Sequence, residues 1–446
     1  MREKPYHFRL RANIDPIAIP IILLGSAGLL ALGIKYSLFQ FWFGFLQGSP
    51  FLKVISYPLI FSLVVSLVGL VVQTVLWLMY KPHVRNGRKK VDWPSVSVII
   101  CAYNEEEMIA GAIRSVFASY YSKEKLEVIC VDDGSTDGTA REIRKARKTC
   151  GSRLKAISFE KNRGKRRAFY EGFRASHGEV VVSFDADSRL DRSAIRHIVL
   201  PFIKDGETAA VAGRVAVLNE KDNLLTRMLA VRYALAFDFG RGYQSVYGGV
   251  VCCPGALAAY RREFLTRVIR RWLHQRFLGR RSTHGEDRAL TTLAMKFGHM
   301  VRYQSNAVVY TKAPTRIGDM NRMYLRWARG SIRESVEFSR FMLRRYRRRH
   351  RVLPALDFLF TNALFPLHAL LAGVVIYSFV ASPLYIVRHL ALLVAGSFVL
   401  SLYYLRTEQS WAFLYGVPYA VASFFLLWWI VPYSALTVRN QSWLTR

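Results

Sequence analysis

Apolar segments long enough to be membrane helices flank the central part of this chain. Residues 17–34 and 54–80 contain no charged side chain, and each is long enough to span a bilayer. Basic residues precede the first segment and follow the second, so the positive-inside rule predicts that both flanks are cytoplasmic. The aromatic segment 39–45 between them is typical of the membrane interface. A buried helical hairpin is the alternative, which the lengths of the two segments disfavour.

The carboxyl-terminal region is also mostly apolar, in the three stretches 353–386, 390–405 and 411–438. Three full spans would place the basic end of the chain outside the cell, which the positive-inside rule weakly disfavours. Because the third stretch contains Pro418 and Pro432, it could instead break at these prolines, lie in the interface and return. The number of carboxyl-terminal spans therefore stays open.

Between these regions, short apolar runs alternate with amphipathic ones. We predict strands at residues 96–102, 126–132, 154–158 and 180–185, and helices at residues 106–118, 136–148 and 165–176. Strands that alternate with helices indicate a parallel, doubly wound α/β sheet. The chain is accordingly divided into a membrane region at residues 1–90, an α/β domain at 91–337 and a membrane-proximal region at 338–446.

The composition adds a strong positive charge. The chain has 446 residues, with 64 Lys and Arg against 31 Asp and Glu, a formal net charge of +33. Such an excess is typical of proteins that bind nucleic acid, anionic membranes or phosphorylated substrates. Much of it lies on the predicted cytoplasmic flanks and in the basic run 340–351, so we expect contact with anionic lipids and no nucleic acid. The five cysteines have no metal-ligand spacing, which predicts thiols in a reducing compartment.

Two acids follow the predicted strand at residues 180–185, where the sequence V-V-V-S-F-D-A-D includes Asp185 and Asp187. Ligands of open α/β sheets bind outside the carboxyl ends of the strands. Side chains alternate along an extended chain, so both carboxylates are predicted to point the same way. Two such carboxylates suit Mg²⁺ or Mn²⁺ that carries a diphosphate, and a solvated turn is the alternative.

Seven short motifs in one order resemble those of processive membrane glycosyltransferases of family 2. They are A-Y-N-E from Ala102, V-D-D-G-S from Val131, G-K-R from Gly164, D-A-D from Asp185, C-C-P-G from Cys252, G-E-D-R from Gly285 and R-W from Arg326. The resemblance spans nearly the whole chain. It is closest to hyaluronan synthases and to the chitooligosaccharide synthases that make nodulation-factor backbones.

The resemblance implies a GT-A-type, Rossmann-like domain on the cytoplasmic side of the plasma membrane, with flanking transmembrane and interfacial helices. It also implies an inverting, metal-dependent enzyme that uses a UDP-sugar to extend a β-linked polysaccharide and passes the product across the membrane. UDP-N-acetylglucosamine is the expected donor, and UDP-glucuronate stays open as a second one. Oligomeric state and partner subunits stay open.

A UDP-sugar needs a slot for uracil and charge neutralisation for its diphosphate. Tyr103 and Glu105 are expected to bind substrate, with the Tyr103 ring on uracil, and Asp132 or Asp133 to accept a hydrogen bond from its N3–H. Lys165 lies at the predicted start of a helix, where its charge and free N–H groups can meet phosphate. An ordinary turn with a helix cap and a solvated lysine are the alternatives.

Asp287 is the candidate general base, since a sugar hydroxyl needs a positioned carboxylate to take its proton. Direct attack on the anomeric carbon inverts it, so an α-linked donor gives a β-linkage. Glu286 is expected to contact substrate beside it. The alternative for Asp287 is an N-cap of a helix that starts near Arg288, and both roles can hold together.

The remaining site residues are assigned by resemblance. Arg326 is expected to contact diphosphate and Trp327 to stack on the acceptor sugar, or else they are an interfacial Trp beside a snorkelling Arg. Met323 replaces the family's usual Gln, which puts processivity and acceptor choice in doubt. Cys253 and Gly255 belong to the expected acceptor-side loop.

The chain ends in Ser442-Trp443-Leu444-Thr445-Arg446, which resembles the family's W-G-T-R-type gating segment. Arg446 is expected to meet diphosphate and Trp443 to act as an anchor, with a dispensable tail as the alternative. Two other functions compete with polymer synthesis. One is a non-processive transferase that acts on a lipid or glycolipid acceptor. The other is a catalytically silent protein that binds UDP-sugars or anionic lipid, which the intact Asp185, Asp187 and Asp287 disfavour.

Overall fold

The computed structural model describes residues 50–85, 92–344, 346–347, 351–363 and 384–440, together with residues 20, 21, 24, 25, 28 and 373. The aromatic segment 39–45 and the chain end with Trp443 and Arg446 lie outside the described residues. The same holds for the predicted span 17–34 apart from the five single residues named above.

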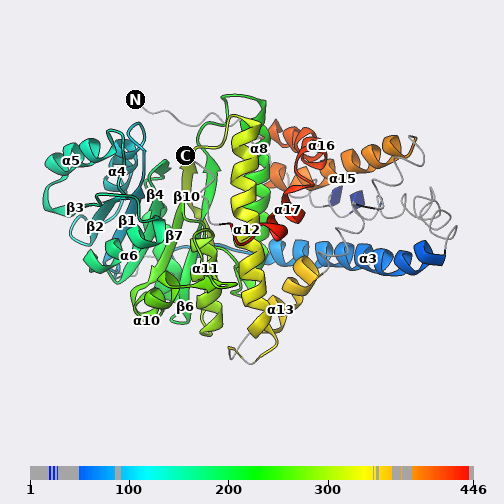
Figure 1. Ribbon diagram of the computed structural model, residues 1–446, viewed down its shortest axis with the longest axis horizontal. Helices are drawn as coiled ribbons and strands as arrows, with labels where there is room; N and C mark the ends of the chain where they lie inside the picture. The colour runs from blue at the N-terminus through cyan, green and yellow to red at the C-terminus, as the bar shows by residue number, and fades with distance from the viewer. Residues whose placement is uncertain are drawn as a thin grey trace.

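The centre of the molecule is a mixed eight-stranded sheet (Figure 1). Its strands, in spatial order, are β3 (Leu154–Ser158), β2 (Leu126–Asp132), β1 (Val96–Ala102), β4 (Val180–Asp185), β7 (Leu257–Arg261), β6 (Thr208–Val217), β10 (Met300–Thr311) and β5 (Ser188–Leu190). The four strands predicted from sequence are confirmed at the same bounds. Most side chains of β1, β2 and β4 are buried on both faces, as the apolar runs indicated, whereas in β3 only Leu154 is buried.

The prediction of a parallel sheet is confirmed for the four predicted strands and is wrong for the rest of the sheet. Strands β3, β2, β1 and β4 are parallel, but β7 runs antiparallel to both β4 and β6, and β5 runs antiparallel to β10. The reason is where β7 begins. The chain reaches β7 through Gly255, whose position is close to Asp185 at the carboxyl end of β4, so β7 has to run back along β4.

Helices cover both faces of the sheet. One face packs against α4 (Ile109–Phe117), α5 (Thr139–Cys150), α7 (Ala194–Lys204) and α8 (Leu224–Ala234). The other face packs against α6 (Lys165–Ala175), α10 (Arg262–Leu273) and α11 (Glu286–Lys296). Alternate residues of β1 enter the two cores, with Val98 and Ile100 on one side and Ile99 on the other.

Two predicted helices start about three residues late because their first residues bind neighbouring loops instead. The backbone N–H of Glu106 donates to Asp137 Oδ2 at 3.2 Å, and the N–H of Thr136 donates to Asn104 Oδ1 at 2.9 Å. Asn104 itself has a left-handed backbone with φ of 54°. These contacts join the loops after β1 and β2 into one unit, which holds the candidate site residues of both loops together.

A long helix, α12 (Ile317–Met342), stands beside the sheet (Figure 1). It contacts α11 on one side and α17 (Ile430–Leu436) on the other, and it continues past the boundary predicted at residue 337. The other elements are a π-helix (Leu235–Phe239), α9 (Gly240–Val246), α13 (Val352–Phe358), a second π-helix (Leu359–Ala363), the 3₁₀ helices Gly151–Arg153 and Trp411–Tyr415, and the short pair β8 (Arg276–Phe277) and β9 (Arg280–Arg281).

The described parts of the predicted membrane segments form α3 (Pro50–Met79), α13 with the π-helix after it, α15 (Leu384–Glu408), α16 (Gly416–Leu426) and α17, while residues 364–372 and 374–383 of the stretch 353–386 lie outside the described residues. Among the described residues, no single helix is both long enough and apolar enough to cross a bilayer. The two helical segments Trp411–Leu426 and Ile430–Leu436, which meet at a bend of 45°, are long and apolar enough when taken together. The break between these two segments lies between Pro418 and Pro432 and not at either proline, where we expected it. Each proline occupies the first turn of its helix, where it costs no hydrogen bond.

Part of the basic run 340–351 has a structural role that its composition did not predict. Arg347 is buried, and its guanidinium donates to the carbonyl oxygens of Gly248 at 2.9 Å and Tyr247 at 3.0 Å, just after α9. A cation is favourable at the carboxyl end of a helix. The expectation that the run faces anionic lipid is therefore wrong for Arg347.

Candidate active site

An ammonium group lies between two carboxylates at the carboxyl edge of the sheet. Lys165 begins α6, and its Nζ is 2.6 Å from Asp185 Oδ1 at the end of β4 and 3.2 Å from Glu286 Oε1 at the start of α11. Burial alone would lower the pKa of Lys165, but the two acids raise it well above its usual value. Burial opposes ionisation of Glu286, yet Lys165 and Arg326 outweigh it and lower the pKa of Glu286 to about 2. Lys165 and Glu286 are therefore charged at neutral pH.

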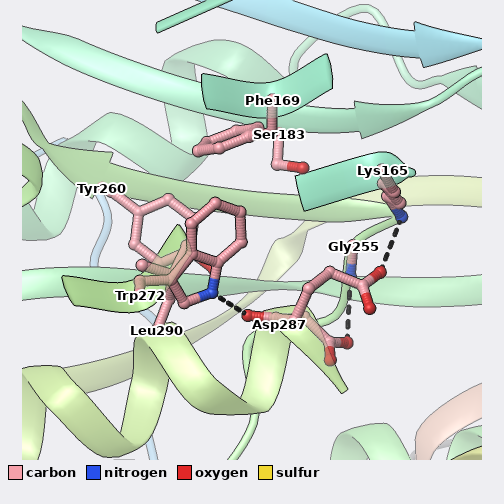
Figure 2. Close-up of a pocket in the computed structure, with 9 residues that line it drawn as sticks. Lys165, Phe169, Ser183, Gly255, Tyr260, Trp272, Asp287 and Leu290 are labelled. Atoms are coloured by element: carbon pink, nitrogen blue, oxygen red, sulfur yellow. Dashed lines mark hydrogen bonds and ion pairs between the residues drawn. The ribbon is translucent and has the colours of Figure 1, made fainter. Parts of the chain in front are cut away.

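Asp287, the candidate base, is the second residue of α11 and lies beside this cluster (Figure 2). Its Oδ2 accepts a hydrogen bond from the backbone N–H of Gly255 at 3.3 Å and lies 3.7 Å from Cys252 Sγ, and its Oδ1 accepts from the N–H of Arg288 at 2.7 Å. Burial and the charge of Glu286 raise the pKa of Asp287. The environment thus favours a carboxyl group that can pick up a proton.

Asp287 is not the N-cap considered from sequence. Gly285 takes that position, with a left-handed φ of 64°, and the helix starts at Glu286. A Cβ at Gly285 would lie 2.9 Å from the backbone of Gly330 on α12, so the glycine also permits the close approach of the two helices.

Gly255 brings the preceding loop against the charged cluster. A Cβ at this position would be 2.7 Å from Lys165 Nζ and 3.4 Å from Asp185 Oδ1, so a side chain here would compete with the lysine. Cys253 of the same loop is fully buried in the core, and its N–H donates to Thr291 Oγ1 at 3.0 Å. The structure thus places Gly255 at the cluster and the Cys253 side chain beneath it.

Asp132 and Asp133 follow β2 and are both nearly inaccessible. Asp132 accepts from the backbone N–H of Ser135 at 3.1 Å and from Ser158 Oγ at 3.0 Å, which fastens β2 to the end of β3. Asp133 accepts from the N–H of Arg163 at 2.8 Å, and burial raises its pKa. It thereby holds the loop from which α6 and Lys165 start. Tyr103 and Glu105 lie in the adjoining loop after β1.

Asp187 does not continue the strand that carries Asp185. The strand β4 ends at Asp185, and the next two residues form a turn, so the alternation expected of an extended chain does not reach Asp187. Its Oδ1 accepts from Ser188 Oγ at 3.2 Å and from Thr311 Oγ1 at 3.3 Å at the end of β10. In the described part of the chain, no three or more His, Cys, Asp or Glu side chains gather as a metal site. Two carboxylates still fit a Mg²⁺-type ion, which proteins often hold by one or two carboxylates plus substrate phosphates.

The acceptor-side residues lie on α12. Trp327 is 40% exposed and packs edge-on against Tyr324, with ring centroids 5.6 Å apart. Arg326 is close enough to Glu286 to lower its pKa. Met323 is buried, and the hydroxyl of Tyr233 donates to its sulfur at 3.4 Å, so the residue that replaces the family's usual Gln belongs to the core.

Four further residues form an apolar wall of the pocket around Asp287, and sequence reasoning missed them. A small pocket is lined by Lys165, Gly255, Glu286 and Asp287, by Ser183, and by Phe169, Tyr260, Trp272 and Leu290 (Figure 2). The last four have the spacing of ordinary core residues on α6, β7, α10 and α11, so no local signal distinguishes them.

Comparison with known proteins agrees with this arrangement. Residues 97–269 match the model of glycosyl transferase family 2. This segment is therefore similar to a family 2 glycosyltransferase domain. It carries Lys165, Asp185 and Gly255, while Asp287 lies just beyond it.

The domain is similar to those of rhizobial enzymes. The chain is 36% identical over 244 residues to an N-acetylglucosaminyltransferase of Mesorhizobium japonicum, which covers 55% of this chain and 57% of the relative. It is 34% identical over 242 residues to an N-acetylglucosaminyltransferase of Rhizobium meliloti, which covers 54% and 57%. The chain thus spans a little over half the length of the relatives that it matches.

A solved structure shares the fold. The mannosyltransferase PcManGT from Pyrobaculum calidifontis, in complex with GDP-Man and Mn²⁺, has a TM-score of 0.53 at 19% identity. The match covers 82% of this chain and 99% of that protein. It supports the GT-A-like sheet with helices on both faces.

Proposed function

We propose that the protein is an inverting transferase that uses UDP-N-acetylglucosamine to extend a β-linked sugar chain. The family 2 domain and the N-acetylglucosaminyltransferases among its relatives support sugar transfer and this donor. The observation that carries the proposal is Asp287, a carboxyl group with a raised pKa in the pocket that also contains Lys165. A carboxyl group with a raised pKa is a stronger base once it is ionised.

The chain's own groups suit each part of the reaction. When the donor binds, Lys165 would pair with its diphosphate in place of Asp185, and Arg326 would supply a second positive charge. Asp287 would take the proton of the acceptor hydroxyl as that oxygen attacks the anomeric carbon. The oxygen attacks from the side opposite the departing UDP, which inverts the anomeric centre. Trp327, on the exposed face of α12, would stack on the acceptor sugar.

Mg²⁺ or Mn²⁺ is the proposed cofactor, with Asp185 and Asp187 as its protein ligands. When bound, the ion supplies positive charge for the departing diphosphate. The mannosyltransferase of similar fold, which was solved with Mn²⁺, supports this part of the proposal.

The proposal extends to the membrane and to the product. We infer a multi-pass protein of the plasma membrane, with a cytoplasmic catalytic domain, contact with anionic lipids and passage of the growing chain through its own helices. A non-processive transferase with a lipid or glycolipid acceptor is the second candidate. Met323 favours it, because a thioether that accepts from the Tyr233 hydroxyl stands where the resemblance leads us to expect a glutamine amide that could bind a polymer.

The test is incubation of the purified protein in lipid with each radiolabelled UDP-sugar in the presence of Mn²⁺. Incorporation from UDP-N-acetylglucosamine into a product with β-linkages supports the proposal. A free polymer indicates processive synthesis, whereas label that stays on lipid indicates the second candidate. Incorporation only from another donor, or equal incorporation by Asp287→Asn, would overturn it.

A further inference from the structure

The pocket around Asp287 has two chemically different walls. One is charged and contains Lys165, Glu286 and Asp287. The other is apolar and aromatic and comes from Phe169, Tyr260, Trp272 and Leu290 (Figure 2). A sugar ring with only hydroxyl substituents would leave at least one polar group against this second wall, where its hydrogen bonds to water are lost.

The aromatic wall is held rigidly. The indole N–H of Trp272 donates to the backbone oxygen of Glu286 at 2.8 Å, which ties the wall to the residue before the base. Arg166 lies over the indole ring at 5.1 Å, and its guanidinium donates to the Trp272 carbonyl at 2.6 Å. Phe169 packs edge-on against Trp272 at 5.7 Å. The wall therefore has a fixed shape, which a binding surface needs if it is to select by size.

The wall also offers polar groups at its border. Ser183 and Tyr260 line the pocket and carry one hydroxyl each. A substituent with an apolar end and an adjacent amide would match this combination better than a hydroxyl or a charged group would.

We propose that the aromatic wall of the pocket receives the methyl end of the 2-acetamido group of the donor sugar, with Leu290 as the residue that limits its size. This inference rests on the proposed function, because it concerns the same pocket and donor. In this proposal, the aromatic wall selects a donor with a 2-acetamido group over the corresponding donor with a 2-hydroxyl group. One methylene in an apolar pocket is worth roughly 10–200-fold in specificity.

The experiment enlarges the pocket and the ligand together. Leu290→Ala is compared with the wild type on UDP-N-acetylglucosamine and on its N-propanoyl analogue, which is longer by one methylene. The ratio of kcat/KM for the longer donor over the natural one is expected to rise by about ten-fold or more. An unchanged ratio overturns the inference.

Leu293→Ala is the matched control. Leu293 lies on the same helix and is also buried, but it does not line the pocket, so both variants remove the same atoms from the core. Its ratio is expected to stay within about two-fold of the wild type. An equal rise in both variants would mean general loosening and would overturn the inference. If Leu290→Ala does not fold, Leu290→Val makes the same comparison with a smaller change.

The design separates the two levels of the argument. If the wild type transfers no N-acetylglucosamine but transfers another sugar, the proposed function fails. If it transfers N-acetylglucosamine and the Leu290→Ala ratio does not move, only the role of the wall fails.

Discussion

Lys165 Nζ lies 2.6 Å from Asp185 Oδ1, so a positive charge of the protein already occupies the first acid of the D-A-D motif. Their side chains are 23% and 30% exposed, which leaves the pair only partly screened by solvent. A divalent cation that uses Asp185 must therefore compete with Lys165, unless a diphosphate gives the lysine another partner. Metal and donor are expected to bind together.

Lys165→Gln tests this competition. Without the ammonium group, a cation can bind Asp185 without competition. Mn²⁺ should then bind roughly ten-fold more tightly in the absence of nucleotide, because two close charges interact by several kcal/mol and a part of that energy suffices for this change in affinity. Electron paramagnetic resonance of free Mn²⁺ measures this without any turnover. Lys148→Gln, on the exposed side of α5, is the control and should change nothing. Equal Mn²⁺ affinity in the wild type and in Lys165→Gln would contradict the prediction.

Metal dependence is tested at the second acid. Asp187→Asn should abolish transfer with little loss of stability, because Asp187 contributes two side-chain hydrogen bonds of 3.2 and 3.3 Å that an amide oxygen can still accept. EDTA should likewise stop the wild type, reversibly on addition of Mn²⁺ or Mg²⁺. The measurements are incorporation of label and thermal unfolding. Full activity of the wild type in the presence of EDTA would contradict metal dependence.

Asp287→Asn should separate binding from chemistry. Asparagine keeps one of the two oxygens that accept from the N–H groups of Gly255 and Arg288, and it cannot take a proton, so donor affinity should be near normal. Turnover should fall by roughly 10²–10⁴-fold. Calorimetric titration with UDP-N-acetylglucosamine and rate measurements check the two parts. Asp319→Asn, in the exposed first turn of α12, is the control, and lost donor binding in Asp287→Asn would assign Asp287 a structural role.

The pH dependence follows from the same carboxyl group. Burial and Glu286 raise the pKa of Asp287, and a base works only when ionised, so the rate should fall on acidification at a higher pH than for an ordinary aspartate. Glu286→Gln removes the charge that raises this pKa, so the acidic limb of the kcat profile should move to lower pH. Glu337→Gln on α12 should leave it in place. A shift toward higher pH in Glu286→Gln would contradict this assignment.

The parts of the fold that were predictable are those in which one local pattern has one structural meaning. The strands β1, β2 and β4 were predicted at their observed bounds because a run buried on both faces is largely apolar. The direction of β7 was not predictable, because it depends on the approach of Gly255 to Asp185, two residues far apart in sequence.

The same distinction holds for the site. Lys165, Asp185 and Asp287 were selected as charged groups at element ends, and the structure brings Lys165 to Asp185 and places Asp287 in the same pocket. Trp272 and Leu290 were missed because an apolar residue at helical spacing has the same pattern in a core and in a pocket wall. Arg347 was misassigned for the converse reason, since a charged run gives no sign of which member is buried.

The last prediction concerns the end of the chain, which follows α17. The guanidinium of Arg329 on α12 donates to Thr437 Oγ1 at 3.0 Å, so the end of α17 is fastened to the helix that also contacts α11 and its Asp287. If the bent pair α16 and α17 returns to the side from which it entered, Trp443 and Arg446 can reach the pocket. Deletion of residues 442–446 should then raise KM for the donor more than it lowers thermal stability.

A cysteine at Ser442 tests the side of the membrane. With an impermeant thiol reagent on sealed vesicles, Ser442→Cys should be labelled from the same side as Lys148→Cys, which lies on the exposed face of α5 in the catalytic domain. The protein without either substitution gives the background from its five native cysteines. The Arg329–Thr437 contact favours this result, because Thr437 lies five residues before Ser442 and is held by α12. Labelling of Ser442→Cys from the opposite side, or full activity of the truncated enzyme, would contradict gating by the chain end and favour three carboxyl-terminal spans.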